Sequence, residues 1–120
     1  MADRLLFISW GQAVRGREAR GLEVFNEAMG MLGRMQQEGR IESFDVAVLE
    51  PNGDMSGFVV VHGSAEQIAS VRQDEEFLRS TADTVLIVDK FRHIEGSANE
   101  GVARQIAIFQ EAIAKVPQLT

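Results

Sequence analysis

Four short segments of the chain are apolar at nearly every position and show no alternation of apolar and polar residues. They span residues 5–10, 44–49, 58–61 and 85–88. A strand with one solvated face alternates, whereas a strand buried on both faces does not. We therefore interpret the four segments as strands of one sheet that is covered on both sides.

Helical periodicity fills the space between the first two of these segments. Over residues 18–38, apolar side chains recur at steps of three and four, as expected for a core-facing helix. This stripe consists of Leu22, Phe25, Met29, Leu32 and Met35 or Gln36. Gly39 follows as a helix stop, because glycine readily adopts the left-handed conformation that ends a helix.

Two further helices are predicted from capping boxes, in which a Ser and a Glu or Gln three residues later satisfy each other's backbone amides. Ser64 and Gln67 start a helix after the third strand, and Ser97 and Glu100 start a C-terminal helix that Pro117 ends. The C-terminal helix carries one apolar face, formed by Val102, Ile106, Phe109 and Ile113.

The order of these elements indicates the fold. Residues 51–53, Pro-Asn-Gly, lie between the second and third strands and predict a hairpin. A chain of 120 residues is the usual size of one domain. Right-handed crossovers then give a ferredoxin-like βαββαβ fold of the α+β class. Its antiparallel sheet has the spatial order 4-1-3-2, both helices cover one face, and a C-terminal helix follows.

The second face of this sheet needs a cover as well. It carries apolar side chains from every strand, more than a monomer usually exposes. Pairing two such faces would contribute on the order of 10 kcal/mol, comparable with the cost of association. We expect a homodimer that pairs through its sheet faces; the alternative is that the C-terminal helix folds back over its own sheet.

One passage of the chain resembles a known group of proteins. Residues 57–61 (Gly-Phe-Val-Val-Val) lead into 64–66 (Ser-Ala-Glu), a helix, and 74–77 (Asp-Glu-Glu-Phe). This passage resembles YCII-like proteins and their relatives in the dimeric α+β barrel superfamily. The resemblance implies that residues 1–120 form a single dimeric α+β barrel domain. It implies no single activity, because the superfamily includes cofactor-free monooxygenases, lactone isomerases, dehydratases and haem enzymes. The chain lacks a histidine in the first helix and any tyrosine, which separates it from some subfamilies.

Composition narrows the classes of partner. A net charge of −6 argues against nucleic acid, whose binding relies on clustered Lys and Arg. The absence of cysteine excludes a disulfide, a thiol nucleophile and a zinc–thiolate site. No apolar stretch approaches the roughly 20 residues of a membrane span, and the first apolar run is too short for a signal peptide. We expect a cytoplasmic protein without a membrane partner, and we assign it no cofactor.

His62 and Asp45 are the candidate catalytic residues. The hairpin register places Asp45 opposite or diagonal to His62 on one sheet face. A carboxylate fixes the tautomer of an imidazole and raises its basicity, as a general base requires. The competing interpretation is a structural contact at a surface or interface. His93 is predicted at the same sheet edge, where the three side chains would be suitable for a metal, although we assign none.

A pocket between helix and sheet is the candidate binding site. Glycines inside a helix are costly, so those at positions 30 and 33 indicate either space for a ligand or close packing against the C-terminal helix. Trp10, at the end of the first strand, is suited either to stacking on a ligand or to core packing. The predicted lining consists of Trp10, Met29, Gly30, Gly33, Arg72 and His93.

Two classes of function remain open. The first is an enzyme or binding protein for a small molecule, with one pocket per subunit between sheet and helices. The second is a non-catalytic interaction or accessory protein that uses the dimer as a platform. The residues do not form a strong catalytic constellation, so the sequence leaves the enzymatic status open.

Overall fold

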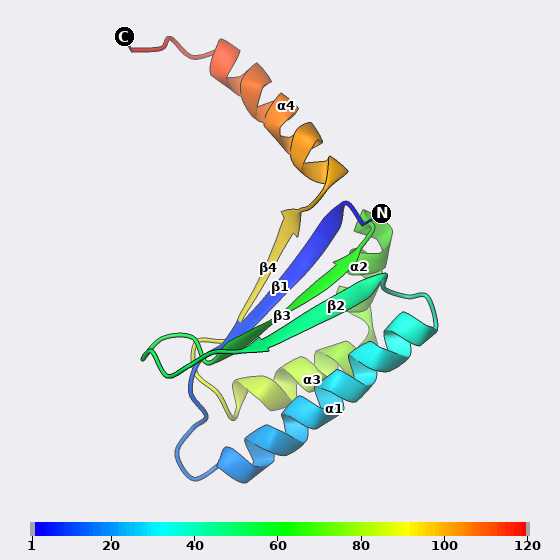
Figure 1. Cartoon of the computed structure of the whole chain (residues 1–120), viewed down its shortest axis with the longest axis vertical. Coiled ribbons are helices and arrows are strands. Elements are labelled where there is room, and N and C mark those ends of the chain that lie inside the picture. Colours follow the sequence, from blue (N-terminus) through cyan, green and yellow to red (C-terminus); the bar gives the residue numbers. More distant parts are fainter. Residues whose placement is uncertain (1, 120) are drawn as a thin grey trace.

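A single four-stranded antiparallel sheet is the centre of the molecule (Figure 1). The computed structural model describes residues 2–119. The strands are β1 (Arg4–Trp10), β2 (Ser43–Val48), β3 (Gly57–Gly63) and β4 (Arg92–Ser97), in the spatial order β2-β3-β1-β4. This is the predicted order, so the ferredoxin-like α+β fold is confirmed.

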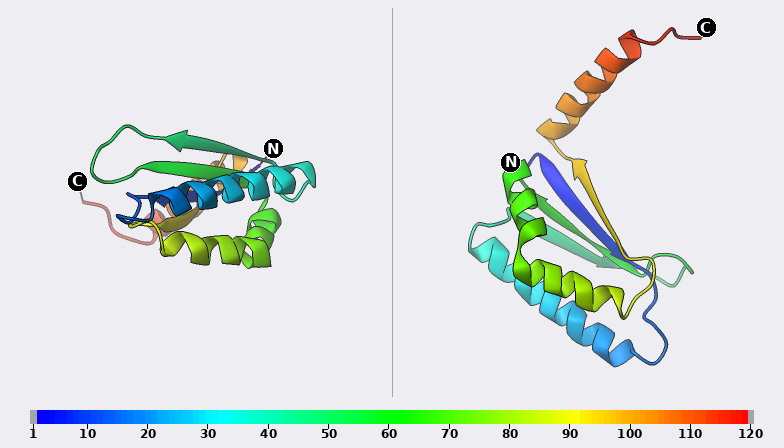
Figure 2. Two further views of the ribbon diagram at one scale, coloured as in Figure 1. Left: turned by 90° about the horizontal axis from the view of Figure 1, so that it is seen from below. Right: turned by 180° about the vertical axis from the view of Figure 1, so that it is seen from behind.

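Three helices lie on one side of the sheet, as both views in Figure 2 show. They are α1 (Glu18–Gln37), α2 (Ala65–Gln73) and α3 (Glu75–Val85). The apolar core fills the space between these helices and the sheet. Its buried members include Leu6, Ile8, Val59 and Val61 from the strands and Met31, Leu32, Met35, Ile68, Val71 and Phe77 from the helices.

The ends of α1 and α2 follow the predicted local chemistry. Gly39 has a φ of +73° and ends α1, with the Arg40 amide donating to the Met35 carbonyl at 2.8 Å. At the start of α2, the Gln67 amide donates to Ser64 Oγ at 3.1 Å, and the Ser64 amide donates to Gln67 Oε1 at 2.8 Å. The helix stop and the first capping box are therefore confirmed.

The predicted position of the fourth strand was wrong. Residues 85–88 end α3 and begin the next connection, where the Val14 amide donates to the Ile87 carbonyl at 2.7 Å. The actual fourth strand, β4, contains Arg92 and Glu95. An edge strand has only one neighbour in the sheet and tolerates polar residues, so β4 can lack the apolar signature that the other three strands carry.

The remaining helix, α4 (Glu100–Ala114), projects from the end of β4 (Figure 1). The predicted capping box at Ser97 is not formed, because Ser97 belongs to β4 and Asn99 occupies the N-cap position. Within residues 2–119 no element covers α4, so the alternative that this helix folds back over its own sheet was wrong. Its apolar side chains are exposed.

Candidate functional site

A mostly apolar cavity lies between the sheet and the helices α1 and α3. Its volume is about 90 Å³. The side chains around it include Trp10 from β1, Phe25 and Met29 from α1, Phe77 from α3 and His93 from β4. We call this space the helix–sheet cavity. Its position matches the predicted pocket, although its volume is below the several hundred Å³ that is usual for ligand sites.

His93 supplies the most distinctive polar atom of the helix–sheet cavity. It pairs with Ile8 across the sheet and therefore faces the helices. Its ring lies 5.3 Å from the ring of Phe77 and 4.8 Å from that of Phe91, measured between centroids. Its Nε2 atom is buried and has no hydrogen-bond partner among the described residues. Burial, with a smaller contribution from the charge of Arg72, lowers the pKa of His93 below its ordinary 6.5, which favours the neutral ring.

Trp10 forms a wall of the same cavity. Its partner across the strands is Gly57, and a Cβ atom added there would lie 2.6 Å from Cζ2 of the indole. Glycine at position 57 thus allows the ring to lie over the first residue of β3. On the helix side, the ring of Phe25 meets the indole edge-on, with 5.8 Å between centroids. Glycine and phenylalanine together fix the orientation of Trp10.

Hydroxyl groups from α3 complete the lining of the cavity. The sequence analysis did not predict these residues as part of the pocket. Ser80, Thr81 and Thr84 lie along the cavity, and Thr84 Oγ1 donates to the Ser80 carbonyl at 2.7 Å. The spacing of three, four and seven residues from Phe77 could have indicated them, because these positions share a helix face. That signal required the recognition of α3 as a separate helix.

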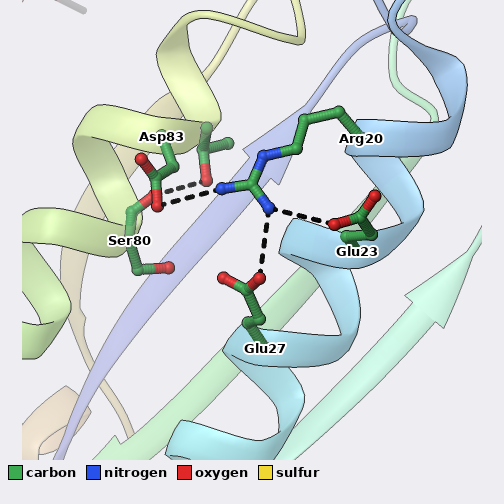
Figure 3. Close-up of polar contacts among 6 residues, drawn as sticks. Arg20, Glu23, Glu27, Ser80 and Asp83 are labelled. Carbon is green, nitrogen blue, oxygen red and sulfur yellow. Dashed lines mark hydrogen bonds and ion pairs between the residues drawn. The ribbon is translucent and has the colours of Figure 1, made fainter.

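An ion-pair network joins α1 and α3 outside the cavity (Figure 3). The guanidinium of Arg20 lies 3.1 Å from Glu27 and 3.4 Å from Glu23 on α1, and 3.6 Å from Asp83 on α3. Gly21 and Thr84, the residues next to Arg20 and Asp83, belong to the cavity lining. The network therefore holds the two helices together at the rim of the cavity, although each exposed pair contributes less than about 1 kcal/mol.

The contact predicted between Asp45 and His62 is present. Asp45 pairs with Val60, one step diagonal to His62, and the Oδ2 atom of Asp45 lies 3.0 Å from Nε2 of His62. Both side chains lie on the uncovered sheet face, and Asp45 is 77% exposed. The pair is thus outside the helix–sheet cavity, on the other side of the sheet. The acid–base role of the two residues stays a prediction.

The predicted grouping of the histidines was wrong. His93 faces the helices and His62 faces away from them, because their partners on β1, Ile8 and Leu5, point to opposite sides of the sheet. Across residues 2–119, no group of three or more His, Asp or Glu side chains is arranged to hold a metal ion. The suggested set of two histidines and an aspartate is therefore not assembled.

The six residues predicted to line the pocket divide into two groups. Trp10, Met29 and His93 line the helix–sheet cavity. Gly30 and Gly33 do not, and neither packs against α4: an added Cβ at Gly33 would have no neighbour within 4 Å. Arg72 instead donates to Glu95 at 2.7 Å. The interior glycines therefore mark neither a pocket nor a helix contact.

Comparison with solved structures supports the fold. A dimeric protein of unknown function and ferredoxin-like fold from Bacteroides fragilis NCTC 9343 matches with a TM-score of 0.59 and 8% identity, over 79% of this chain and 96% of that one. SnoaB, a cofactor-independent oxygenase from Streptomyces nogalater, matches with a TM-score of 0.54 and 15% identity, over 82% and 95%. A conserved protein of unknown function from Bacteroides thetaiotaomicron VPI-5482 gives a TM-score of 0.59 at 9% identity, over 82% and 100%.

These likenesses establish a shared ferredoxin-like fold and no shared activity, because the sequence identities are low. No family model matches the chain. No curated protein matches it either. In the part of the chain that the structure describes, none of the helices has both the length and the apolar character required to span a lipid bilayer.

Proposed function

We propose that this protein binds a small, largely apolar molecule in the helix–sheet cavity and that Nε2 of His93 makes the polar contact. The observation that carries the proposal is the buried Nε2 atom of His93, which has no hydrogen-bond partner among residues 2–119 and lies on a mostly apolar wall. A buried polar atom without a partner costs about 1–3 kcal/mol. A ligand with one hydrogen-bonding group recovers that free energy and also fills the cavity.

The volume of the cavity limits the size of the ligand. About 90 Å³ accommodates a molecule of roughly one ring. Larger ligands require side chains to move, and Met29 is suited to this because its unbranched chain adapts to different shapes. We therefore propose a monocyclic or similarly small ligand with a single polar group.

The uncovered sheet face supports a homodimer as the functional form. Leu5, Phe7, Phe58, Val60 and Ile94 lie on this face. Phe7 and Phe58 contact each other with 5.3 Å between ring centroids. The protein from Bacteroides fragilis with the same fold is dimeric, which supports a homodimer, and sheet-to-sheet pairing is the mode that we propose for it. The cytoplasmic location and the relationship to YCII-like proteins remain further parts of this proposal.

A binding screen with matched variants tests the ligand proposal. The probes are phenol, indole and cyclohexanol, and the measurement is the concentration-dependent rise in Tm. His93→Phe fills the space without offering a polar atom. We therefore expect the apparent affinity, taken from the concentration dependence of Tm, to fall at least tenfold. His62→Phe, on the other side of the sheet, is the control and should bind as the wild type does. Binding that is equal in both variants would contradict the proposed contact with His93, and the absence of binding to the wild type would favour the dimer as a non-catalytic platform.

A further inference from the structure

The uncovered sheet face carries one charged side chain on each of its two edge strands. Asp45 lies on β2 and pairs with Val60, which belongs to this face. Arg92 lies on β4, two residues before Ile94, and therefore shares the face of Ile94. Both charged residues are exposed. Because β2 and β4 are the opposite edges of the sheet (Figure 1), an acidic edge and a basic edge flank an apolar centre.

These two charges are not neutralised by each other within one chain, because the width of the sheet separates them. Arg92 forms no ion pair with any of residues 2–119, whereas Glu95 on the same strand is paired with Arg72 at 2.7 Å. Asp45 contacts the ring of His62 and keeps 77% of its side chain exposed. A charge that becomes covered without a partner is costly. A surface that covers this face must therefore offer a positive charge to β2 and a negative charge to β4.

The register of the sheet places the two charges in neighbouring rows of side chains. The row of Asp45 continues across the sheet through Val60 and Phe7 to Ile94. It is the middle row of the face, with one row on either side. Arg92 belongs to the next row, about 7 Å further along the strands, because two residues of a strand cover that distance.

Two identical sheets with aligned strands can pack face to face about two orientations of a twofold axis. With the axis along the strands, β2 of one copy lies over β4 of the other, and Asp45 faces the basic edge of the partner. With the axis across the strands, each strand lies over its own copy. The two Asp45 carboxylates then face each other, because their row is the middle one, and like charges in this position weaken an interface.

The first orientation brings Asp45 within reach of Arg92 of the partner. Facing sheets lie about 10 Å apart, and the offset of one row adds about 7 Å along the strands. The Cα atoms of the two residues are then on the order of 12 Å apart. The long side chain of arginine and the shorter one of aspartate together span this separation. The twofold axis repeats the contact, so the dimer contains the pair twice.

We infer that the second copy of the chain sits on the sheet face with the twofold axis along the strands, so that Asp45 of each protomer pairs with Arg92 of the other. This inference rests on the homodimer proposed above and specifies its orientation. The apolar centre of the face drives the association. The two ion pairs select the orientation, because complementary charges fix the register of an interface.

Reversal of the two charges tests this arrangement, with the dimer dissociation constant from sedimentation equilibrium as the measurement. Asp45→Arg presents a like charge to Arg92 of the partner, and we expect the dissociation constant to rise at least tenfold. Asp45→Arg with Arg92→Asp restores opposite charges and should return it to within threefold of the wild type. Asp45→Arg with Arg79→Asp is the control. It has the same net charge, but Arg79 lies on α3 beside Glu75, so it should give no rescue.

Asp45→Asn separates the two orientations of the axis with almost no change in side-chain size. With the axis along the strands it removes an attraction, so the dissociation constant should rise. With the axis across the strands it removes the repulsion between the two Asp45 carboxylates, and the dissociation constant should fall. An unchanged or lower value for Asp45→Asn, or a double reversal without rescue, would overturn the inference and leave the homodimer standing. A wild-type chain that is monomeric at micromolar concentration would reject the homodimer and this inference with it.

Discussion

The ring of His93 lies against the ring of Phe77, with 5.3 Å between their centroids. The contact joins the edge strand β4 to the helix α3 and buries a polar ring beside an apolar space. Nε2 of His93 is left without a hydrogen-bond partner among residues 2–119. A side chain held in this way is available to a ligand rather than to the protein itself, which is why the proposed function centres on it.

The burial of His93 predicts a pH dependence of stability. Its folded-state pKa is lowered from 6.5, chiefly by burial, so the unfolded chain binds the proton more readily. The free energy of unfolding should therefore fall as the pH drops below about 6.5, until the folded-state pKa is passed. His93→Gln removes this titration. We expect urea unfolding between pH 7.5 and pH 5 to show a smaller loss for His93→Gln than for the wild type, and equal losses would contradict the prediction.

The packing of Trp10 on Gly57 predicts a cost for any side chain at position 57. In Gly57→Ala the new methyl group would lie 2.6 Å from the indole and 2.7 Å from the carbonyl of Ala47. Such overpacking typically costs about 1–3 kcal/mol. The chain has one tryptophan, so its fluorescence emission reports the displacement of the indole directly. An unchanged emission maximum together with unchanged stability would show that the packing is looser than described.

Gly33→Ala is the counterpart of Gly57→Ala, and we expect it to stabilise the protein rather than destabilise it. It lies inside α1, and an added Cβ would have no neighbour within 4 Å. Alanine there should raise the free energy of unfolding by up to about 1 kcal/mol, because glycine is the less favourable residue in a helix interior. Chemical denaturation measures the change. A destabilised Gly33→Ala protein would show that position 33 has a contact beyond those within the chain.

Asp74 is predicted to stabilise the junction of α2 and α3. Its Oδ2 accepts the amide of Phe77 at 3.0 Å, and its Oδ1 accepts from Arg40 at 2.7 Å. Asp74→Ala should lower the free energy of unfolding at pH 7 by about 1–2 kcal/mol, through loss of the helix cap. Glu76→Gln, at an exposed ion pair with Arg34, is the control and should change stability by less than about 1 kcal/mol.

The pKa of Asp74 extends this prediction to acid. Hydrogen bonding to Arg40 lowers that pKa below the ordinary 3.8. The stabilisation is therefore present above the ordinary value and is lost as the pH falls through the lowered pKa. The difference between the wild type and Asp74→Ala should shrink toward pH 2. A difference that stays constant down to pH 2 would contradict the role of the ionised carboxylate.

The sequence predicted the sheet better than the site. Local signals such as the capping box at Ser64, the stop at Gly39 and the hairpin at 51–53 are sufficient to order the first three strands. Hairpin register also predicted the diagonal contact of Asp45 and His62. These features depend on residues close together along the chain, or on the simple alternation of side chains across a strand.

The errors came from features that depend on distant neighbours. The fourth strand was predicted at residues 85–88 because the true strand, β4, contains the charged residue Glu95. The partners that accommodate this charge, Arg4 and Arg72, are distant in the sequence. With the strand ending at 88, His93 was expected at the same sheet edge as His62, whereas the two histidines lie on opposite faces of the sheet. Leu22 was expected in the core but is 69% exposed, because the buried face of α1 runs through Val24 instead. Periodicity indicates a helix without fixing which side chains reach the core.

The most direct test of ligand binding at His93 uses histidine NMR. The chain has two histidines, on opposite faces of the sheet, so ¹⁵N-histidine labelling reports each face separately. On titration with phenol, indole or cyclohexanol, at least one probe should shift the Nε2 resonance of His93 saturably while the resonances of His62 stay in place. A probe that saturates by shifting only His62, or the absence of any saturable shift at His93 with all of the probes, would contradict the account.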